Sequence, residues 1–412
     1  MQGLDSFVGM NDRSVNGKHE AQRYDVDQGR NSVTILAREI FSPEHAMLRD
    51  SVRKFFEREV VPHHRDWEKA GVAPRSIWKL AGAAGLLCVA LPEEYGGAGA
   101  DRLSSAILIE EQARLGLSGP GFSTHSDIVA PYIFNYGTEA QKRLWLPAMA
   151  AGDMIGAIVL TEPGAGSDLR AIRTTAIRDG DDLVLNGQKT FITNGQCADL
   201  LLVAAKSGQG SSTKDLTLLV VEASRVGVSR GKNFEKVGMK AQDTCELFFD
   251  NVRVPVTNIL GEEGKGFKLL SKELAWERLQ IAIGAVATST AALDWTREYT
   301  RNRKAFGTLI ADFQNTRFRL AEIKTEIEIA QVFVDRCLRE VNEERLDVTV
   351  AAMAKYWCTE LMGRVVDQCV QLHGGYGYMW EYPIARAFAD ARVHRIYGGS
   401  NEIMRELVAR TL

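Results

Sequence analysis

The chain has 412 residues, of which 45% are hydrophobic and 25% are charged, and its net charge is −3. This length allows two or three domains, and the composition is that of an ordinary globular protein. The small negative charge gives no electrostatic case for nucleic-acid binding. Apolar runs such as 81–91 and 281–293 are shorter than the roughly 18 residues of a membrane span, so we expect a soluble protein with no membrane span.

Six cysteines are scattered along the chain, with no Cys-x-x-Cys pair and no nearby histidine that would complete a zinc set. They are Cys88, Cys197, Cys245, Cys337, Cys358 and Cys369. Structural zinc sites need closely spaced ligands. We therefore expect no metal site, and free thiols in a reducing compartment.

The first thirty residues contain four aspartates and one glutamate and no apolar core segment. Neither a secretory signal nor a typical transit peptide has this composition. We expect residues 1–38 to form a flexible N-terminal arm, and we expect a bacterial cytoplasmic protein rather than one of the mitochondrial matrix.

Residues 39–155 have the pattern of an α-helical domain. Ser42 is a suitable N-cap and Pro43 suits the first helical position. Apolar residues then recur at helical intervals from Met47 to Val60, and further helical stretches cover 78–87, 103–115 and 138–149.

Residues 156–264 change to short β-rich runs at 183–185, 200–205, 216–222 and 246–255. Clusters of Gly, Asn, Asp and Ser separate these runs, as in an antiparallel sheet or small barrel. We predict a central antiparallel β domain inserted between two helical ones.

Residues 265–412 return to a helical pattern. Apolar residues from Thr316 to Val341 alternate in steps of four and three, the period of a helix packed along a bundle. Four segments, 265–302, 313–343, 347–371 and 381–410, predict a four-helix bundle. The predicted fold class is thus α+β multidomain.

Glu277 lies inside a long apolar helical stretch, 274–282. An ionised carboxylate is costly there unless it is paired, hydrated or used chemically. Arg278 beside it also fits a plain surface ion pair, so the residue alone leaves both interpretations open.

Two polar, glycine-rich strings open the β region, at 161–168 and 186–195, although the chain has no dinucleotide or P-loop fingerprint. Backbone beside small residues can approach a flat ring or a phosphate closely, and Phe191 with Thr193 offers an aromatic face and a hydroxyl. Taken as isolated turns, both strings can equally be structural.

Two further glycine clusters lie near the C-terminus, at 371–378 and 396–402. His373 alone is typical of a satisfied histidine at a helix end. Together with 238–244 and 303–307, the four strings resemble, in order and separation, the motifs of the acyl-CoA dehydrogenase family, from about residue 40 onward. Within the family, residues 238–249, 354–357 and 377–384 are most similar to the long-chain branch.

The resemblance implies an FAD enzyme that desaturates an acyl-CoA between its α and β carbons and passes electrons to an electron-transfer flavoprotein. Most members carry the general base where this chain has Gly398. The branch with long-chain and isovaleryl enzymes instead uses a Glu-Arg-Leu string on the first long bundle helix, found here at 277–279. The resemblance therefore implies Glu277 as general base, with the Gly398 N–H free to donate to the thioester oxygen.

By matching motifs, the resemblance also implies a set of FAD-binding residues, some of them serving the flavin of a neighbouring subunit. They are Ile158, Val159, Leu160, Thr161, Glu162, Pro163, Gly164, Ala165, Gly166, Ser167, Phe191, Ile192, Thr193, Arg303, Gln314, Gln371, Leu372, His373, Gly374, Gly375, Ser400, Asn401 and Glu402. The substrate set implied in the same way is Ser167, Ala275, Trp276, Glu277, Arg278, Gly398 and Gly399. Ala275 and Trp276 replace the usual Pro-Gln of the long-chain branch, so we expect the indole to narrow or reshape the acyl channel.

We expect a homo-oligomer, a tetramer rather than a dimer, acting on a medium- to long-chain acyl-CoA. Three alternatives remain open at this point. They are a dehydrogenase of branched or steroid side-chain thioesters, an acyl-CoA oxidase, and a flavin-binding protein of the same fold without turnover.

Overall fold

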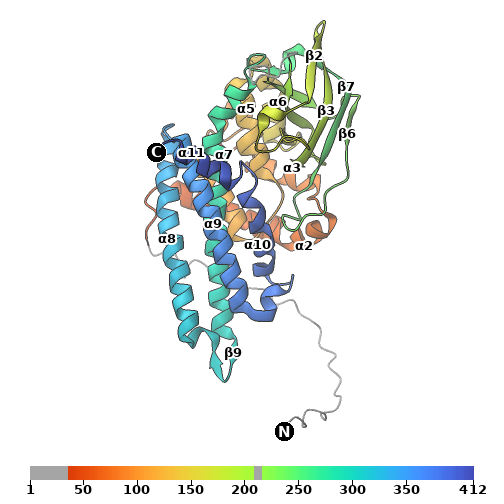
Figure 1. Cartoon of the computed structure of the whole chain (residues 1–412). Coiled ribbons are helices and arrows are strands. Elements are labelled where there is room, and N and C mark those ends of the chain that lie inside the picture. The colour runs from red at the N-terminus through yellow and green to blue at the C-terminus, as the bar shows by residue number, and fades with distance from the viewer. Residues whose placement is uncertain (1–35, 208–215) are drawn as a thin grey trace, which may run out of the picture.

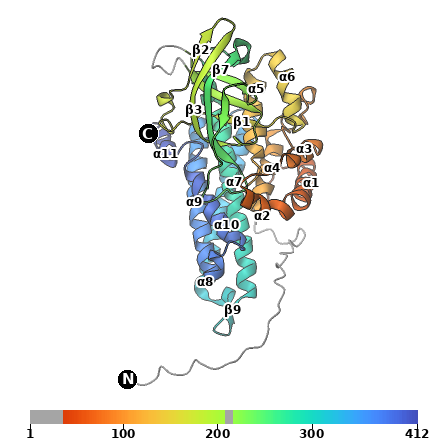
Figure 2. The same cartoon turned by 90° about the vertical axis from the view of Figure 1, so that its right-hand side faces the viewer.

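The computed structural model describes residues 36–207 and 216–412. A helical part, a β part and a helical bundle follow one another along the chain, which confirms the predicted fold class. The β sheet packs at one end of the bundle and the N-terminal helices lie beside it (Figures 1 and 2). The predicted arm falls almost entirely outside the described residues.

In the N-terminal part, the stretches predicted at 103–115 and 138–149 are helices to within one residue. The one predicted at 78–87 ends at Ala83, and the helices at 61–70 and 130–136 were not predicted. Ser42 caps the first helix through its side chain, and Pro43 is its first residue. A π-helical turn, Thr124–Val129, leads directly into α5. The α-helices are α1 Pro43–Glu59, α2 Val61–Ala70, α3 Arg75–Ala83, α4 Arg102–Arg114, α5 Ala130–Tyr136 and α6 Glu139–Ala150.

The β part is one eight-stranded sheet in the order β6-β7-β3-β2-β4-β5-β8, with β1 pairing to β4. Its pairs are antiparallel, as predicted, except that β1 and one bridge of β2 run parallel to β4. The strands are β1 Gly156–Val159, β2 Thr175–Asp179, β3 Asp182–Thr193, β4 Leu200–Lys206, β5 Leu216–Glu222, β6 Val228–Arg230, β7 Thr244–Pro255 and β8 Ile259–Leu260.

An irregularity in β3 matters for the site. The pairing of β3 with β7 shifts between Lys189 and Ile192, and Phe191 within this bulge has a φ of 58°. Bulges re-aim side chains, and the Phe191 ring is left 67% exposed. The bulge therefore presents an aromatic face outside the hydrophobic core of the sheet.

Three long helices, α7 Gly266–Asn302, α8 Gln314–Asn342 and α9 Val348–His373, form most of the bundle. The apolar stripe predicted on α8 faces its core. The fourth segment is not one helix, because it divides into α10 Pro383–Ala391, a 3₁₀ turn Arg392–Arg395 and α11 Asn401–Ala409. Gly398 and Gly399, with φ of 63° and 88°, end the helical path between them.

A short hairpin, β9 Lys304–Ala305 and β10 Thr308–Leu309, joins α7 to α8 at the end of the bundle remote from the sheet. Both views show this end projecting beyond the other two parts (Figures 1 and 2). No helix within residues 36–207 and 216–412 is long and apolar enough to cross a membrane.

Candidate active site

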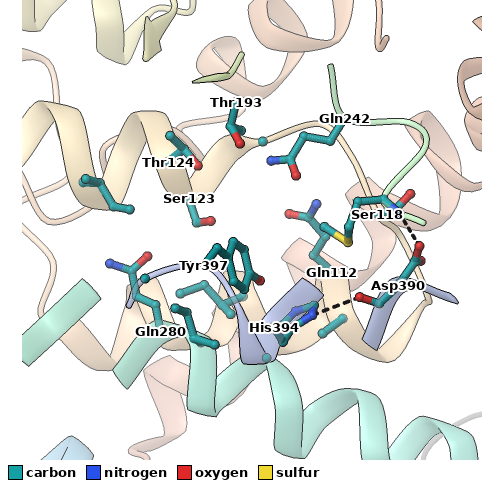
Figure 3. Close-up of a pocket in the computed structure, with 18 of the residues that line it drawn as sticks. Gln112, Ser118, Ser123, Thr124, Thr193, Gln242, Gln280, Asp390, His394 and Tyr397 are labelled. Atoms are coloured by element: carbon teal, nitrogen blue, oxygen red, sulfur yellow. Dashed lines mark hydrogen bonds between the residues drawn. The ribbon is translucent and has the colours of Figure 1, made fainter. Parts of the chain in front are cut away.

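A cavity of about 340 Å³ lies where the three parts of the fold meet. Its walls come from α4, the π-helical turn, β1, the β3 bulge, α7 and the segment around residues 387–398. Figure 3 shows side chains from these elements converging on one space. Eight residues of the predicted site line it, namely Ile158, Leu160, Thr161, Phe191, Ile192, Thr193, Glu277 and Gly398.

Glu277 presents its carboxylate to this cavity from α7. The hydroxyl of Tyr132, on α5, donates a hydrogen bond of 2.8 Å to Glu277 Oε1. The pKa of Glu277 is raised to about 7, mainly by burial and to a smaller extent by the nearby Glu273 charge, while the Tyr132 hydrogen bond and Arg278 act in the opposite direction. A base whose pKa lies near neutrality is suited to proton transfer at physiological pH.

The turn before α5 is tied to α7 on both sides of Glu277. Pro131 has no N–H to offer the carbonyl four residues earlier, and that carbonyl, Asp127 O, instead accepts from Trp276 Nε1 and Gln280 Nε2, each at 3.1 Å. The Trp276 indole is therefore buried in a helix contact and is not among the cavity walls. This placement corrects the expectation that the indole shapes the channel, because one residue along a helix turns the side chain by about 100°.

Gly398 forms the cavity wall with a left-handed backbone. A Cβ at this position would lie 2.3 Å from Ile281 Cδ1 of α7. Its N–H has no acceptor among the described residues. The Gly398 N–H is thus a free hydrogen-bond donor at the cavity wall. Ile281 of α7 leaves no room there for a side chain on residue 398.

The β wall carries features that suit a flat, polar ring. Phe191 exposes its face, and the hydroxyls of Thr161 and Thr193 beside it have no hydrogen-bond partner within the described part of the chain. At Gly164 and Gly166 a Cβ would meet no atom within 4 Å. A flavin ring fits this combination of aromatic surface, hydroxyls and open backbone.

Three residues of the predicted flavin wall are buried inside the β part instead of lining it: Val159, Glu162 and Ala165. Glu162 accepts hydrogen bonds from the N–H groups of Arg173 and Thr174 and from Lys189 Nζ at 2.9 Å. Their position gives them the role of shaping the exposed loop at residues 163–168.

Another part of the predicted FAD set lies at the projecting end of the bundle. Arg303 and Gln314 are exposed there, as are Gln371, Gly374 and Gly375. At a rise of about 1.5 Å per residue, Arg303 lies about 39 Å from Glu277 along α7. The side chains of these two residues therefore cannot reach the same cavity within one chain. Glycines 374 and 375 leave open space where a Cβ would point.

Other side chains at this end of the bundle make contacts within the bundle itself. His373 is buried, its Nδ1 lies 2.8 Å from Cys369 O and its ring stacks on Tyr299 at 4.3 Å, so only its backbone can reach a ligand. Leu372 is half-buried. The Arg303 guanidinium lies 5.2 Å from the centre of the Tyr376 ring.

The start of α11 lies next to the Gly398 loop. Ser400 caps this helix, Asn401 is buried and Glu402 is exposed. Lys355, fully buried on α9, donates to Gly399 O at 2.8 Å and to Asn401 Oδ1 at 2.9 Å. These bonds fix the loop that carries the Gly398 donor.

The other predicted substrate residues surround the cavity without lining it. Ser167 is exposed on its loop, Pro163 likewise, and Ala275 is half-buried on α7. Arg278 is 5% exposed, and its Nε and one terminal nitrogen lack hydrogen-bond partners in the described residues.

Sequence reasoning missed most of the cavity. Tyr132 was not singled out, nor were the polar lining residues Gln112, Ser118, Ser123, Thr124, Gln242, Gln280, Asp390, His394 and Tyr397 (Figure 3). They come from five separate segments, so no local motif unites them. One usable signal exists, because two tyrosines (132, 136) and two glutamates (273, 277) are each spaced by four residues on helices.

Comparisons with known proteins agree with this layout. The descriptions "Acyl-CoA dehydrogenase, N-terminal domain", "middle domain" and "C-terminal domain" match residues 42–153, 157–252 and 264–412. The long-chain specific acyl-CoA dehydrogenase, mitochondrial, of Rattus norvegicus is 52% identical over 95% of this chain and 91% of its own length.

Two solved structures are similar over 90% of this chain. An acyl-CoA dehydrogenase from Geobacillus kaustophilus has a TM-score of 0.89 and 49% identity, over 98% of its chain. A glutaryl-CoA dehydrogenase from Mycobacterium smegmatis in complex with FADH2 has a TM-score of 0.84 and 28% identity, over 95% of its chain. The chain therefore belongs to the acyl-CoA dehydrogenase family of FAD-dependent oxidoreductases.

Proposed function

We propose that this protein desaturates a medium- to long-chain acyl-CoA to the trans-2-enoyl-CoA, with Glu277 as general base. The observation that carries the proposal is a carboxylate with a raised pKa in a cavity that Thr161 and Thr193 also line. Gly398 supplies a free backbone N–H to the same space.

In the proposed reaction, the bond between the α carbon and its hydrogen breaks and the proton goes to the Glu277 carboxylate. When bound, FAD supplies the two-electron acceptor for the β hydrogen, which leaves its carbon with the bonding electron pair. The Gly398 N–H donates to the thioester oxygen, where negative charge develops. Lys355 keeps that donor in place through Gly399 O.

The path of the cavity along α7 supports a long acyl chain. Lining residues run from Glu277 through Ile281 and Gly284 to Thr288, about 16 Å along the helix axis. An extended chain advances by about 1.2 Å per bond, so this length suits about a dozen bonds. A short-chain substrate would leave much of the space unfilled.

A second candidate substrate class is an acyl-CoA whose chain carries oxygen far from the thioester. Gln112, Ser118 and Asp390 lie together on the side of the cavity opposite Gln280 (Figure 3). Each of the three has a hydrogen-bond partner within the chain, and polar walls of this kind suit a polar ligand group better than hydrocarbon alone. Branched and steroid side-chain acyl-CoA thioesters are further candidate substrates, to be compared with straight-chain acyl-CoAs.

We further propose that the protein works as a homo-oligomer, a tetramer, and passes electrons to an electron-transfer flavoprotein. Support for an oligomer comes from the length of α7. This helix separates the predicted FAD residues at Arg303 from the cavity by a distance greater than the length of a flavin ring. A second copy can bring its Arg303 end to this cavity. For the acceptor, support comes from a similar solved structure, 35% identical, whose description names an electron-transferring flavoprotein of Acidaminococcus fermentans.

The test is an anaerobic titration of the purified flavoprotein with acyl-CoAs, following flavin absorbance. The panel contains straight chains of increasing length, a branched chain, a steroid side chain and a hydroxylated chain. Bleaching by the longer chains is the expected result. Bleaching by none of them would overturn the proposal, and rapid reoxidation in air would indicate an oxidase instead.

A further inference from the structure

Two tyrosines of α5 face two glutamates of α7. Tyr132 donates to Glu277 Oε1 at 2.8 Å, and Tyr136 donates to Glu273 Oε1 at 2.6 Å. Both pairs arise because residues four apart lie on the same face of a helix. The two pairs have the same chemistry one turn apart, so they can be compared directly.

The pairs differ in their surroundings. Glu273 accepts a second hydrogen bond, from the exposed Asn135, and does not line the cavity. Among the described residues, Tyr132 is the only hydrogen-bond donor to the Glu277 side chain. The Tyr132 ring is 1% exposed, so its hydroxyl has no access to bulk water as an alternative partner.

The direction of the Tyr132 bond is fixed. Burial, and then the charge of Glu277, raise the pKa of the Tyr132 hydroxyl well above its ordinary value. The hydroxyl therefore keeps its proton and donates. One carboxylate oxygen, Oε1, is occupied by this bond, and Oε2 remains for a proton from elsewhere.

The frame that holds the two side chains is rigid. Trp276 and Gln280, which flank Glu277, both donate to Asp127 O in the turn that precedes α5. With the bonds from Tyr132, Asn135 and Tyr136, five hydrogen bonds register α7 against residues 127–136. A carboxylate held by such a frame loses little rotational freedom when substrate binds.

We propose that Tyr132 is the positioning residue for the base, holding Oε1 of Glu277 so that Oε2 accepts the α proton of the acyl-CoA. This inference rests on the proposed function. In the step, the α carbon–hydrogen bond breaks and an O–H bond forms at Oε2, while the hydrogen bond from Tyr132 to Oε1 is kept. Tyr132 touches neither of the reacting atoms and acts through Glu277 alone.

The ionisable groups around Glu277 set the sign of the test. Glu273 and Arg278 lie on its own helix, and other groups come from α5 and across the cavity, namely Tyr132, Tyr136, Asp390, His394 and Tyr397. Removing the Tyr132 donor destabilises the anion of Glu277, so the pKa of the base rises. Tyr136 donates to Glu273 and not to Glu277, so removing its hydroxyl takes no hydrogen bond from the Glu277 anion and should not raise that pKa.

The experiment compares Tyr132→Phe with Tyr136→Phe in the holoenzyme. For Tyr132→Phe, we expect the acid limb of kcat/KM to move up by about one to two pH units, the size of a lost hydrogen bond to a charged group. We also expect kcat on the high-pH plateau to fall about 10- to 100-fold. Tyr136→Phe should show no upward shift, and an acid limb and plateau unchanged in Tyr132→Phe would overturn the proposal.

Infrared titration of the protonated carboxyl band, assigned by its loss in Glu277→Gln, reads the same pKa without turnover. In the wild type this band should be that of a hydrogen-bonded carboxyl, and a free carboxyl would also overturn the proposal, even if Tyr132→Phe failed to fold. Wild-type turnover in Glu277→Gln would instead defeat the proposed function itself. An inactive Glu277→Gln with a wild-type profile in Tyr132→Phe would defeat the positioning role alone.

Discussion

The two ends of α7 carry opposite kinds of site. Near Glu277 the helix is largely buried. It forms hydrogen bonds to α5 and to the turn before it, and it lines a cavity. At Arg303 the same helix ends in an exposed hairpin at the projecting end of the bundle. The first end lines a cavity of its own chain, and the second presents polar groups outward.

We propose that this difference separates residues that set the proton transfer from residues that hold the outer part of the cofactor. Changes at the Glu277 end should alter proton transfer without releasing FAD. Changes at the Arg303 end should release FAD without altering the base. The following expectations test that separation.

Among variants that keep the Glu277 carboxylate, the largest effect should follow Gly398→Glu. A Cβ there meets Ile281 Cδ1 at 2.3 Å, and the left-handed φ of 63° strains any side chain. Because the free N–H and the cavity wall both shift, we expect kcat to fall about 100-fold. Steady-state kinetics with the best acyl-CoA measures this.

Gly180 offers a matched control, since its φ is 64° and a Cβ there meets nothing within 4 Å. Gly180→Glu should keep wild-type kcat. Adding Ile281→Ala to Gly398→Glu should restore part of the loss. Equal losses in Gly180→Glu and Gly398→Glu would mean that strain alone, not the cavity wall, explains the effect.

A smaller effect is expected for Arg303→Ala, at the other end of α7. Loss of a charge-assisted hydrogen bond to FAD should weaken its binding about 10- to 100-fold. The dissociation constant of FAD, measured by flavin fluorescence on the reconstituted protein, tests this. Arg301→Ala, also exposed at this end, should bind FAD normally, and the pH profile of both reconstituted variants should match the wild type.

The pH dependence probes the Glu277 end alone. Burial raises the pKa of Glu277 to about 7, and the base must be unprotonated to act. kcat/KM should therefore fall about tenfold per pH unit below 7 and level off above it. Glu273→Gln removes a like charge and should move the limb to lower pH; a shift to higher pH would contradict the assigned electrostatics.

The smallest effect on specificity should come from Trp276→Leu. The variant loses a hydrogen bond to Asp127 O and packing volume, about 2–4 kcal/mol of stability. Because the indole does not line the cavity, the ratio of kcat/KM between long and short acyl chains should stay unchanged. Measuring Tm checks the expected loss of stability. A changed ratio would show that the indole does shape the acyl channel.

Much of the site could be predicted from the sequence because its motifs are local. The glycine strings at 161–168 and 186–195, and the Glu-Arg-Leu string at 277–279, each fall on one element whose backbone fixes their geometry. The predicted helices and strands likewise followed from local periodicity. The role of each site residue remains a prediction until the variants are measured.

What could not be predicted depends on contacts between distant elements. The direction of Trp276 was set by the unpaired Asp127 carbonyl, which in turn reflects Pro131 in another helix. The end of the helical path after α10 was not predicted, because Gly398 and Gly399 were interpreted only as ligand-binding residues. The Tyr132 bond to Glu277 needed the packing of α5 on α7, which no periodicity within either helix specifies.

The most direct test of the central claim is anaerobic rapid mixing of Glu277→Gln with the acyl-CoA that bleaches the wild type. The amide keeps the size of the side chain but cannot take the α proton. We expect a spectral change from acyl-CoA binding to the oxidised flavin, and no bleaching. Bleaching at the wild-type rate would contradict the account and place the base elsewhere in the cavity.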